Sequence, residues 1–178
     1  GAENILDRKH AEVYAEYQSR LVKAGAMDFD DLLTKTVELF TTHGEVLAHY
    51  RERFVHILVD EYQDTNNAQN QMVLMLAGGH NNVCVVGDTD QSVYRFRGAD
   101  FRNILQFEEA FPDVTTVVLD QNYRSTQTIL DAANAVIENN TERRPKSLWT
   151  DSGGGERIQR YHAEDEGDEA NWVAGTAK

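Results

Sequence analysis

FVHILVDEYQDTN, the stretch from Phe54 to Asn66, decides the fold, because an apolar run leads directly into two adjacent carboxylates. The run Val55–Val59 has almost no polar interruption, which is typical of a strand buried on both faces of a parallel sheet. In open α/β sheets, ligands bind outside the carboxyl ends of the strands. Asp60 and Glu61 therefore stand where a ligand is expected.

Two further apolar runs, Val83–Val86 and Val114–Leu119, are also predicted to be strands, with helical patterns between them. Each crossover is longer than the dozen or so residues that a parallel connection requires. The alternation predicts an α/β fold with a parallel sheet and flanking helices. The predicted helices are an N-terminal amphipathic helix at Asn4–Ala24, a helix capped by Asp28, a short helix before Val55, and helices at Asn67–Leu76, Phe101–Phe111, after a cap at Ser125 and around Asp168–Val173. A brief strand is expected near Ile158–His162.

The composition restricts the possible partners. The 178 residues carry a net charge of −13, from 17 basic and 30 acidic residues, which argues against binding nucleic acid through bulk electrostatics. Any such contact must be local. No apolar run approaches the ~20 residues of a membrane helix, and no signal peptide is evident, so we expect a cytoplasmic protein without membrane contact. The single Cys84 is expected to be a reduced core residue.

All three predicted strands end on polar residues: Asp60-Glu61, the loop Gly87–Gln91, and the segment Gln121–Arg124. Strand ends that meet at one edge of a parallel sheet build one site. Carboxylates, an amide and an arginine suit phosphoryl transfer from a magnesium-bound nucleotide. Taken singly, each residue has a structural alternative: a turn former, a half-buried ring in the case of Tyr123, or a surface ion-pair partner.

Four segments of the chain carry a family resemblance: MDFDDLL (Met27–Leu33), VDEYQDTN (Val59–Asn66), GDTDQSVYRFRGA (Gly87–Ala99) and LDQNYRST (Leu119–Thr126). In this order they resemble successive motifs of the UvrD/PcrA/Rep-type DNA helicases of superfamily one. The resemblance implies an incomplete RecA-like motor domain of the P-loop NTPase type. It also implies four parts: a helix returning from an inserted helical subdomain (1–26), the later part of the motor domain (27–139), a linker (140–156) and the start of a second motor domain (157–178).

The resemblance also implies roles for single residues, with ATP and Mg²⁺ as cofactors. Asp60 is expected to help hold Mg²⁺, and Glu61 to orient and deprotonate the attacking water. Gln91 is expected to sense the γ-phosphate. Tyr123 is expected to stack on the adenine, and Arg124 to contact the γ-phosphate as an arginine finger does.

The segment Tyr94-Arg95-Phe96-Arg97 interleaves rings with positive charge, as sequence-tolerant binding of single-stranded DNA requires. Tyr94, Phe96 and Arg97 are therefore expected to contact DNA, with Phe96 standing where many family members carry Trp. The alternative is a strand edge or hairpin whose rings pack inward. Because this loop follows Gln91, we hypothesise that a change at the phosphate is transmitted to the DNA strand.

No G-x-x-x-x-G-K-[ST] motif occurs in these residues, so we expect this piece alone to hydrolyse ATP negligibly. The expected parent is an ATP-dependent 3′→5′ DNA helicase or translocase that acts on single-stranded DNA and on single-strand/duplex junctions, in repair or replication, with repair-protein partners. Three alternatives stay open: the helicase subunit of a helicase–nuclease complex, a non-catalytic nucleotide- or DNA-binding or interaction fragment, and a metal-dependent phosphohydrolase using Asp64, Asp88 and Asp90.

Overall fold

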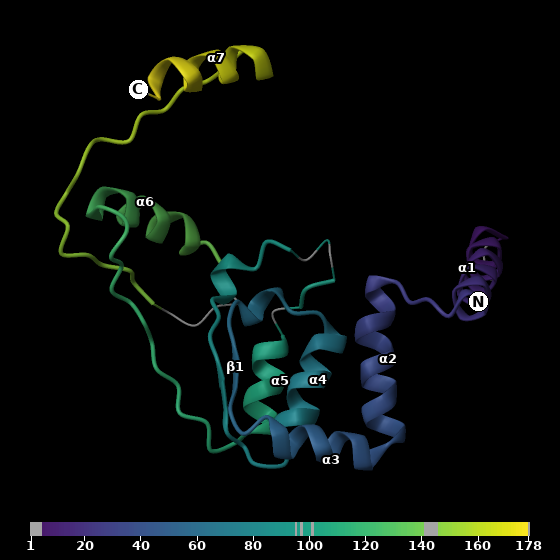
Figure 1. Ribbon diagram of the computed structural model, residues 1–178. Helices are drawn as coiled ribbons and strands as arrows, with labels where there is room; N and C mark the ends of the chain where they lie inside the picture. The colour runs from purple at the N-terminus through teal and green to yellow at the C-terminus, as the bar shows by residue number, and fades with distance from the viewer. Residues whose placement is uncertain (1–4, 95, 97, 101, 141–145, 178) are drawn as a thin grey trace. The chain divides into compact units, whose positions relative to one another are not determined.

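The computed structural model describes residues 5–94, 96, 98–100, 102–140 and 146–177 (Figure 1). It divides into two compact units, Gly1–Val114 (unit 1) and Thr115–Lys178 (unit 2), and each is described by itself. In unit 1 the elements are α1 (Ile5–Ala24), α2 (Phe29–Thr42), α3 (Gly44–Arg53), β1 (Ile57–Val59), the 3₁₀ turn η1 (Tyr62–Asp64), α4 (Asn67–Ala77), β2 (Val83–Val85), the 3₁₀ turn η2 (Thr89–Gln91) and α5 (Asn103–Ala110). Unit 2 contains α6 (Gln127–Ile137) and α7 (Glu166–Thr176).

The sheet of unit 1 confirms the predicted parallel pairing of the first two strands. β1 and β2 are hydrogen-bonded in parallel, with Leu58 opposite Cys84, and α4 forms the crossover between them. Hydrogen bonds continue past the strands, from Val86 N–H to Val59 O (2.8 Å) and from Tyr62 N–H to Val86 O (2.9 Å). The loops that follow β1 and β2 therefore begin side by side.

Helices α2, α3, α4 and α5 and the turn η1 pack together and position these loops (Figure 1). The predicted cap at Asp28 is confirmed, because its carboxylate accepts the Asp31 N–H in a capping box that begins α2. Asn66 begins α4 in the same way with Gln69. Among the described residues of unit 1, the buried apolar side chains are Phe40, Tyr62, Ala77, Ala99 and Phe107.

The predicted third strand is wrong. In the structure, residues 114–119 have no strand conformation, and Val117, Val118 and Leu119 are largely exposed. A strand exists only when a neighbour satisfies its backbone groups, and the described residues offer 114–119 no such neighbour. The sheet formed by the described residues is thus two-stranded, which agrees with an α/β class but is less than a full RecA-like sheet.

The expected burial of β1 on both faces is also wrong. Leu58 is 79% exposed and Cys84 is exposed, whereas Ile57 and Val59 are half-buried. Successive strand side chains point to opposite faces, so one face of this sheet has no cover among the described residues. Cys84 therefore lies on an open face and not in the core.

Helix α1 corresponds to the predicted N-terminal amphipathic helix. Several of its apolar side chains are exposed, including Val13 and Val22. Its Tyr17 hydroxyl donates to the Asp28 carboxylate (2.9 Å), which ties α1 to the start of α2. Within the described residues, none of the helices combines the length and the apolar character needed to cross a membrane.

In unit 2, helix α6 is capped by Thr126 and not by Ser125, and Thr126 makes no side-chain capping bond. The chain after residue 146 packs on this helix: Asn134 Nδ2 donates to Leu148 O (3.0 Å), and Gln127 N–H donates to Gly153 O (2.8 Å). These bonds fix much of the described part of the predicted linker 140–156 to α6, and both segments lie in unit 2.

No strand forms at residues 158–162, where a brief one was expected. The Tyr161 ring instead stacks on Trp172 of α7, with ring centroids 4.8 Å apart and planes 2° from parallel. The Tyr161 hydroxyl also donates to Asp168, and this bond raises the pKa of the tyrosine. Side-chain contacts with α7 thus replace strand pairing here.

A substitution at Gly155 tests whether the close packing of this residue against Thr126, at the start of α6, stabilises unit 2. Its φ is +74°, and an added Cβ would overlap the Thr126 side chain, so Gly155→Ala is expected to destabilise unit 2 by about 2 kcal/mol. Gly154→Ala is the matched control, because a Cβ there meets nothing within 4 Å. Urea denaturation followed by tryptophan fluorescence reports on unit 2, which contains both tryptophans, Trp149 and Trp172. Equal midpoints for the two variants would contradict this prediction.

Candidate functional site

The loops after β1 and β2 place the predicted acidic residues at the carboxyl edge of the sheet. Glu61 has φ 51° and ψ 42°, a left-handed conformation that non-glycine residues rarely adopt. Asp60 Oδ1 accepts the Glu61 N–H (2.9 Å), and both acidic side chains are exposed. Such backbone conformations persist only where surrounding contacts hold them.

Gln63 supplies one of these contacts and connects the two loops. Its side chain is 1% exposed. Gln63 Nε2 donates to Glu61 Oε2 (2.7 Å), and Gln63 Oε1 accepts the N–H of Asp88 (2.9 Å). The sequence alone does not single out Gln63. The available signal was an amide two positions after the acidic pair, which on its own is typical of an ordinary turn.

Asp88 extends the connection to Gln91. One carboxylate oxygen of Asp88 accepts the Asp90 N–H (3.0 Å), and the other accepts Gln91 Nε2 (2.8 Å). Asp88 is thus a turn former, as one reading of the sequence proposed, and also holds the Gln91 side chain. Glu61, Gln63, Asp88 and Gln91 form a continuous hydrogen-bonded path, called here the strand-end relay.

A polar network that is buried at Tyr62 and Asn70 supports the turn that carries Gln63. Tyr62 is fully buried, its hydroxyl donates to Asn70 Oδ1, and Asn70 Nδ2 donates to Gln106 Oε1 (2.7 Å). The Tyr62 ring meets Phe107 edge-on at 5.7 Å. Burial raises the pKa of Tyr62 to about 12, so its hydroxyl remains a donor at neutral pH. Side chains of helices α4 and α5 therefore hold η1 in place.

The third predicted group lies in unit 2. Asn122 Oδ1 accepts the N–H groups of Arg124 (2.9 Å) and Ser125 (2.7 Å), which forms a tight turn before α6. Tyr123 is 82% exposed, so its ring is not the half-buried core ring of the structural alternative. Within the described part of the chain, the exposed Arg124 guanidinium has no hydrogen-bond or ion-pair partner.

The aromatic loop after η2 presents its rings to solvent. Tyr94 is 41% exposed and Phe96 is 78% exposed, with ring centroids 6.0 Å apart and planes inclined by 46°. An inward-packed hairpin is therefore not what the structure contains. Arg97, the third predicted DNA contact, lies outside the described residues, as does Arg95.

The donor set at the strand ends suits magnesium bound with a nucleotide. Mg²⁺ usually takes one or two carboxylates together with waters and substrate phosphates, and an exposed carboxylate such as Asp60 fits that pattern. Among residues with described placement, no cluster of three or more His, Cys, Asp or Glu side chains is arranged to hold a metal. The phosphohydrolase alternative needs such a cluster, so the geometry gives it no support.

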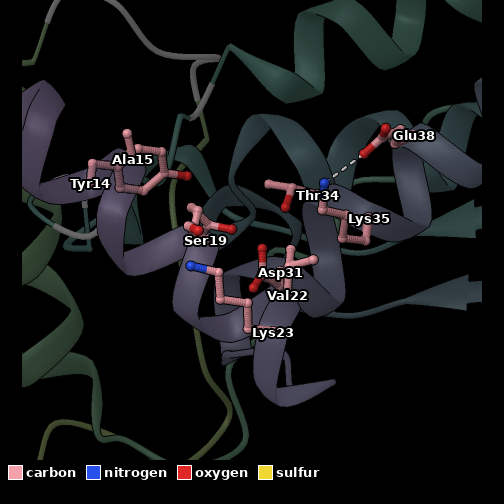
Figure 2. Close-up of a pocket in the computed structure, with 10 residues that line it drawn as sticks. Tyr14, Ala15, Ser19, Val22, Lys23, Asp31, Thr34, Lys35 and Glu38 are labelled. Carbon is pink, nitrogen blue, oxygen red and sulfur yellow. Dashed lines mark hydrogen bonds and ion pairs between the residues drawn. The ribbon is translucent and has the colours of Figure 1, made fainter.

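A hollow of about 720 Å³ lies away from these residues, against α1 and α2 (Figure 2). Lys35 Nζ at its rim pairs with Glu38 Oε2 (2.8 Å), and this exposed pair raises the pKa of the lysine. None of the predicted site residues lines the hollow. It is thus separate from the strand-end relay.

Comparison with family models divides the chain where the structure does. Residues 1–112 match the UvrD/REP helicase N-terminal domain, and residues 117–178 match the UvrD-like helicase C-terminal domain. The gap between the two matches contains the boundary between units 1 and 2.

Comparison with curated proteins finds similar sequences named ATP-dependent DNA helicase PcrA. The protein of Leuconostoc citreum is 52% identical over 172 residues, which are 97% of this chain and 23% of that protein. The proteins of Staphylococcus aureus (strain Mu50) and Staphylococcus epidermidis are 55% and 54% identical over 163 residues, each 92% of this chain and 22% of the relative. The chain thus spans a little under a quarter of the length of these relatives.

Proposed function

Because this chain belongs to the UvrD/REP helicase family, we propose that it is a segment of an ATP-dependent DNA helicase that moves 3′→5′ along single-stranded DNA, in repair or replication. The observation that carries the proposal is the strand-end relay, which holds a carboxylate and an amide at the adjacent ends of two parallel strands. Phosphoryl transfer needs these two groups at such an edge. A fuller RecA-like sheet, with residues 157–178 opening a second motor domain, is part of the proposal.

Each predicted site residue is assigned one task in ATP binding or hydrolysis. Bound Mg²⁺ would neutralise charge on the nucleotide phosphates, with Asp60 as its protein ligand. Glu61 orients the attacking water and accepts its proton, and Gln91 donates its amide to the γ-phosphate. Tyr123 offers an open ring face to the adenine, and Arg124 offers a guanidinium fork to the γ-phosphate.

DNA binding is assigned to the aromatic loop. The net charge of −13 disfavours a broad electrostatic footprint, so stacking must supply much of the affinity. Exposed rings at Tyr94 and Phe96 suit base stacking, which contributes about 1–3 kcal/mol per base. Arg97 is assigned to a DNA phosphate.

The test uses a protein of the length of the PcrA relatives that carries this segment. We expect single-stranded DNA to stimulate its ATPase rate by about tenfold or more, and we expect it to unwind a duplex with a 3′ single-stranded tail but not one with a 5′ tail. Purified alone, the 178-residue chain should show negligible turnover. An ATPase rate that single-stranded DNA does not change contradicts the helicase proposal. Nucleotide binding without hydrolysis favours a non-catalytic role. A nuclease motif elsewhere in the longer protein favours a helicase–nuclease subunit.

A further inference from the structure

We propose that Gln63 is a positioning residue that aims the Glu61 carboxylate at the attacking water and couples its position to the turn that carries Gln91. The inference rests on the proposed function, because it assigns Gln63 a task in the same ATPase site. Gln63 itself touches neither nucleotide nor water in this proposal. It acts through Glu61.

The orientation of the Gln63 amide is set by its two partners. Its nitrogen donates to the Glu61 carboxylate at 2.7 Å, and its oxygen accepts the Asp88 N–H at 2.9 Å. Rotating the amide by half a turn would place its oxygen against a carboxylate and its NH₂ against an N–H, so both bonds would be lost. A buried amide held at both ends has one orientation.

Glu61 needs such a constraint because its side chain is exposed. A free glutamate samples several rotamers, and ordering it costs up to about 2 kcal/mol of side-chain entropy. A general base must lie within hydrogen-bond reach of the proton it removes, and a misplacement of about 1 Å can cost ~10²-fold in rate. The Gln63 bond supplies this order before the nucleotide arrives.

The same amide connects Glu61 to the predicted phosphate sensor. Asp88 receives the Gln63 bond on its backbone and holds Gln91 with its carboxylate. The two loops are tightly fitted at this point, since a Cβ added to Gly87 would lie 2.9 Å from Gln63 Oε1. A shift of Gln91 toward a phosphate therefore displaces the Asp88 turn against Gln63, and Gln63 moves Glu61.

The central variant is Gln63→Leu in the protein of PcrA length, which keeps the side-chain size and removes both bonds. We expect kcat of the DNA-stimulated ATPase to fall by about 10–100-fold, with KM for ATP and Kd for a single-stranded oligonucleotide within about twofold. Gln71→Leu on α4 is the control. It makes the same change at an exposed glutamine that belongs neither to the relay nor to the network that supports η1, so its kcat should not change.

A double-mutant cycle separates positioning from a merely structural role. In a Glu61→Gln background, Gln63→Leu should lower kcat no further, because Gln63 acts through the carboxylate that is already gone. If the two substitutions lower kcat independently, so that their fold-losses multiply in the double variant, the proposal is overturned. If Gln63→Leu does not fold, Gln63→Glu serves instead, because it keeps an acceptor for the Asp88 N–H but opposes the Glu61 carboxylate. Its kcat should fall at unchanged KM.

The outcomes distinguish the two proposals. A native protein with DNA-stimulated ATPase whose kcat survives Gln63→Leu or Gln63→Glu overturns the positioning role and leaves the helicase assignment intact. A native protein without ATPase activity overturns the helicase assignment, and the positioning role falls with it.

Discussion

In a protein of PcrA length that carries this segment, Glu61→Gln is expected to lower the DNA-stimulated kcat for ATP hydrolysis by about 10²–10⁴-fold. The reason is that a neutral amide cannot accept the proton of the attacking water. The replacement is nearly isosteric, and its amide oxygen can still accept from Gln63 Nε2, so the loop should keep its conformation. Steady-state ATPase assays give kcat, and binding of a labelled ATP analogue shows whether the site still forms.

The matched control is Glu52→Gln on α3, another exposed glutamate that lies outside the relay. Its kcat should equal that of the native protein. The base assignment is wrong if Glu61→Gln keeps kcat within about threefold of native, because a lost general base costs far more than that. It is also wrong if the loss comes from failed nucleotide binding.

The parts of the fold that could be predicted are those set by neighbouring residues. The apolar runs around Leu58 and Cys84 pair as predicted, because the α4 crossover joins two strands whose backbone groups satisfy each other. The cap at Asp28 follows from residues within one turn. Residues 114–119 carry an equally clear strand pattern, but a strand also needs a partner, and a local pattern contains no information about whether one is present.

The burial of side chains could likewise be predicted only in part. The run that contains β1 is apolar enough for a fully buried strand, yet Leu58 is 79% exposed. Hydrophobic pattern indicates which side chains can be buried, whereas the cover itself comes from elements elsewhere in the chain. The exposure of Cys84 has the same cause, since it lies opposite Leu58 in the parallel register.

The candidate site divides in a similar way. The place of Asp60, Glu61 and the loop Gly87–Gln91 at the carboxyl edge of the sheet could be predicted, because polar segments that follow apolar runs fall there, and the roles of these residues stay predictions. The bonds of the Gln63 side chain could not be predicted, because one of them joins Asp88, 25 positions further along the chain. The sequence predicts Asp88 to be a turn former or, in the phosphohydrolase alternative, a metal ligand, and the turn it forms is what holds Gln91 in place.

Arg124 carries the other large expected effect. In the protein of PcrA length, Arg124→Ala is expected to lower kcat by about 10³-fold or more, the range of a lost arginine finger. The Arg124 N–H donates to Asn122 Oδ1, which fixes its backbone in the turn, and its guanidinium has no partner among the described residues. Removing the side chain therefore breaks no internal ion pair there, and the midpoint of unfolding should not change.

The shape of the charged group at position 124 should matter as well as its positive charge. Arg124→Lys keeps the positive charge but replaces a planar fork by a point charge, so it should recover only part of the lost kcat. Arg157→Ala is the control, because it removes an exposed arginine from the same unit outside the Gln121–Arg124 segment. If Arg124→Ala hydrolyses ATP at the native rate, or if Arg157→Ala loses as much, then Arg124 does not contact the transferred phosphate. In that case the charge that stabilises the transition state must come from another residue of the longer protein.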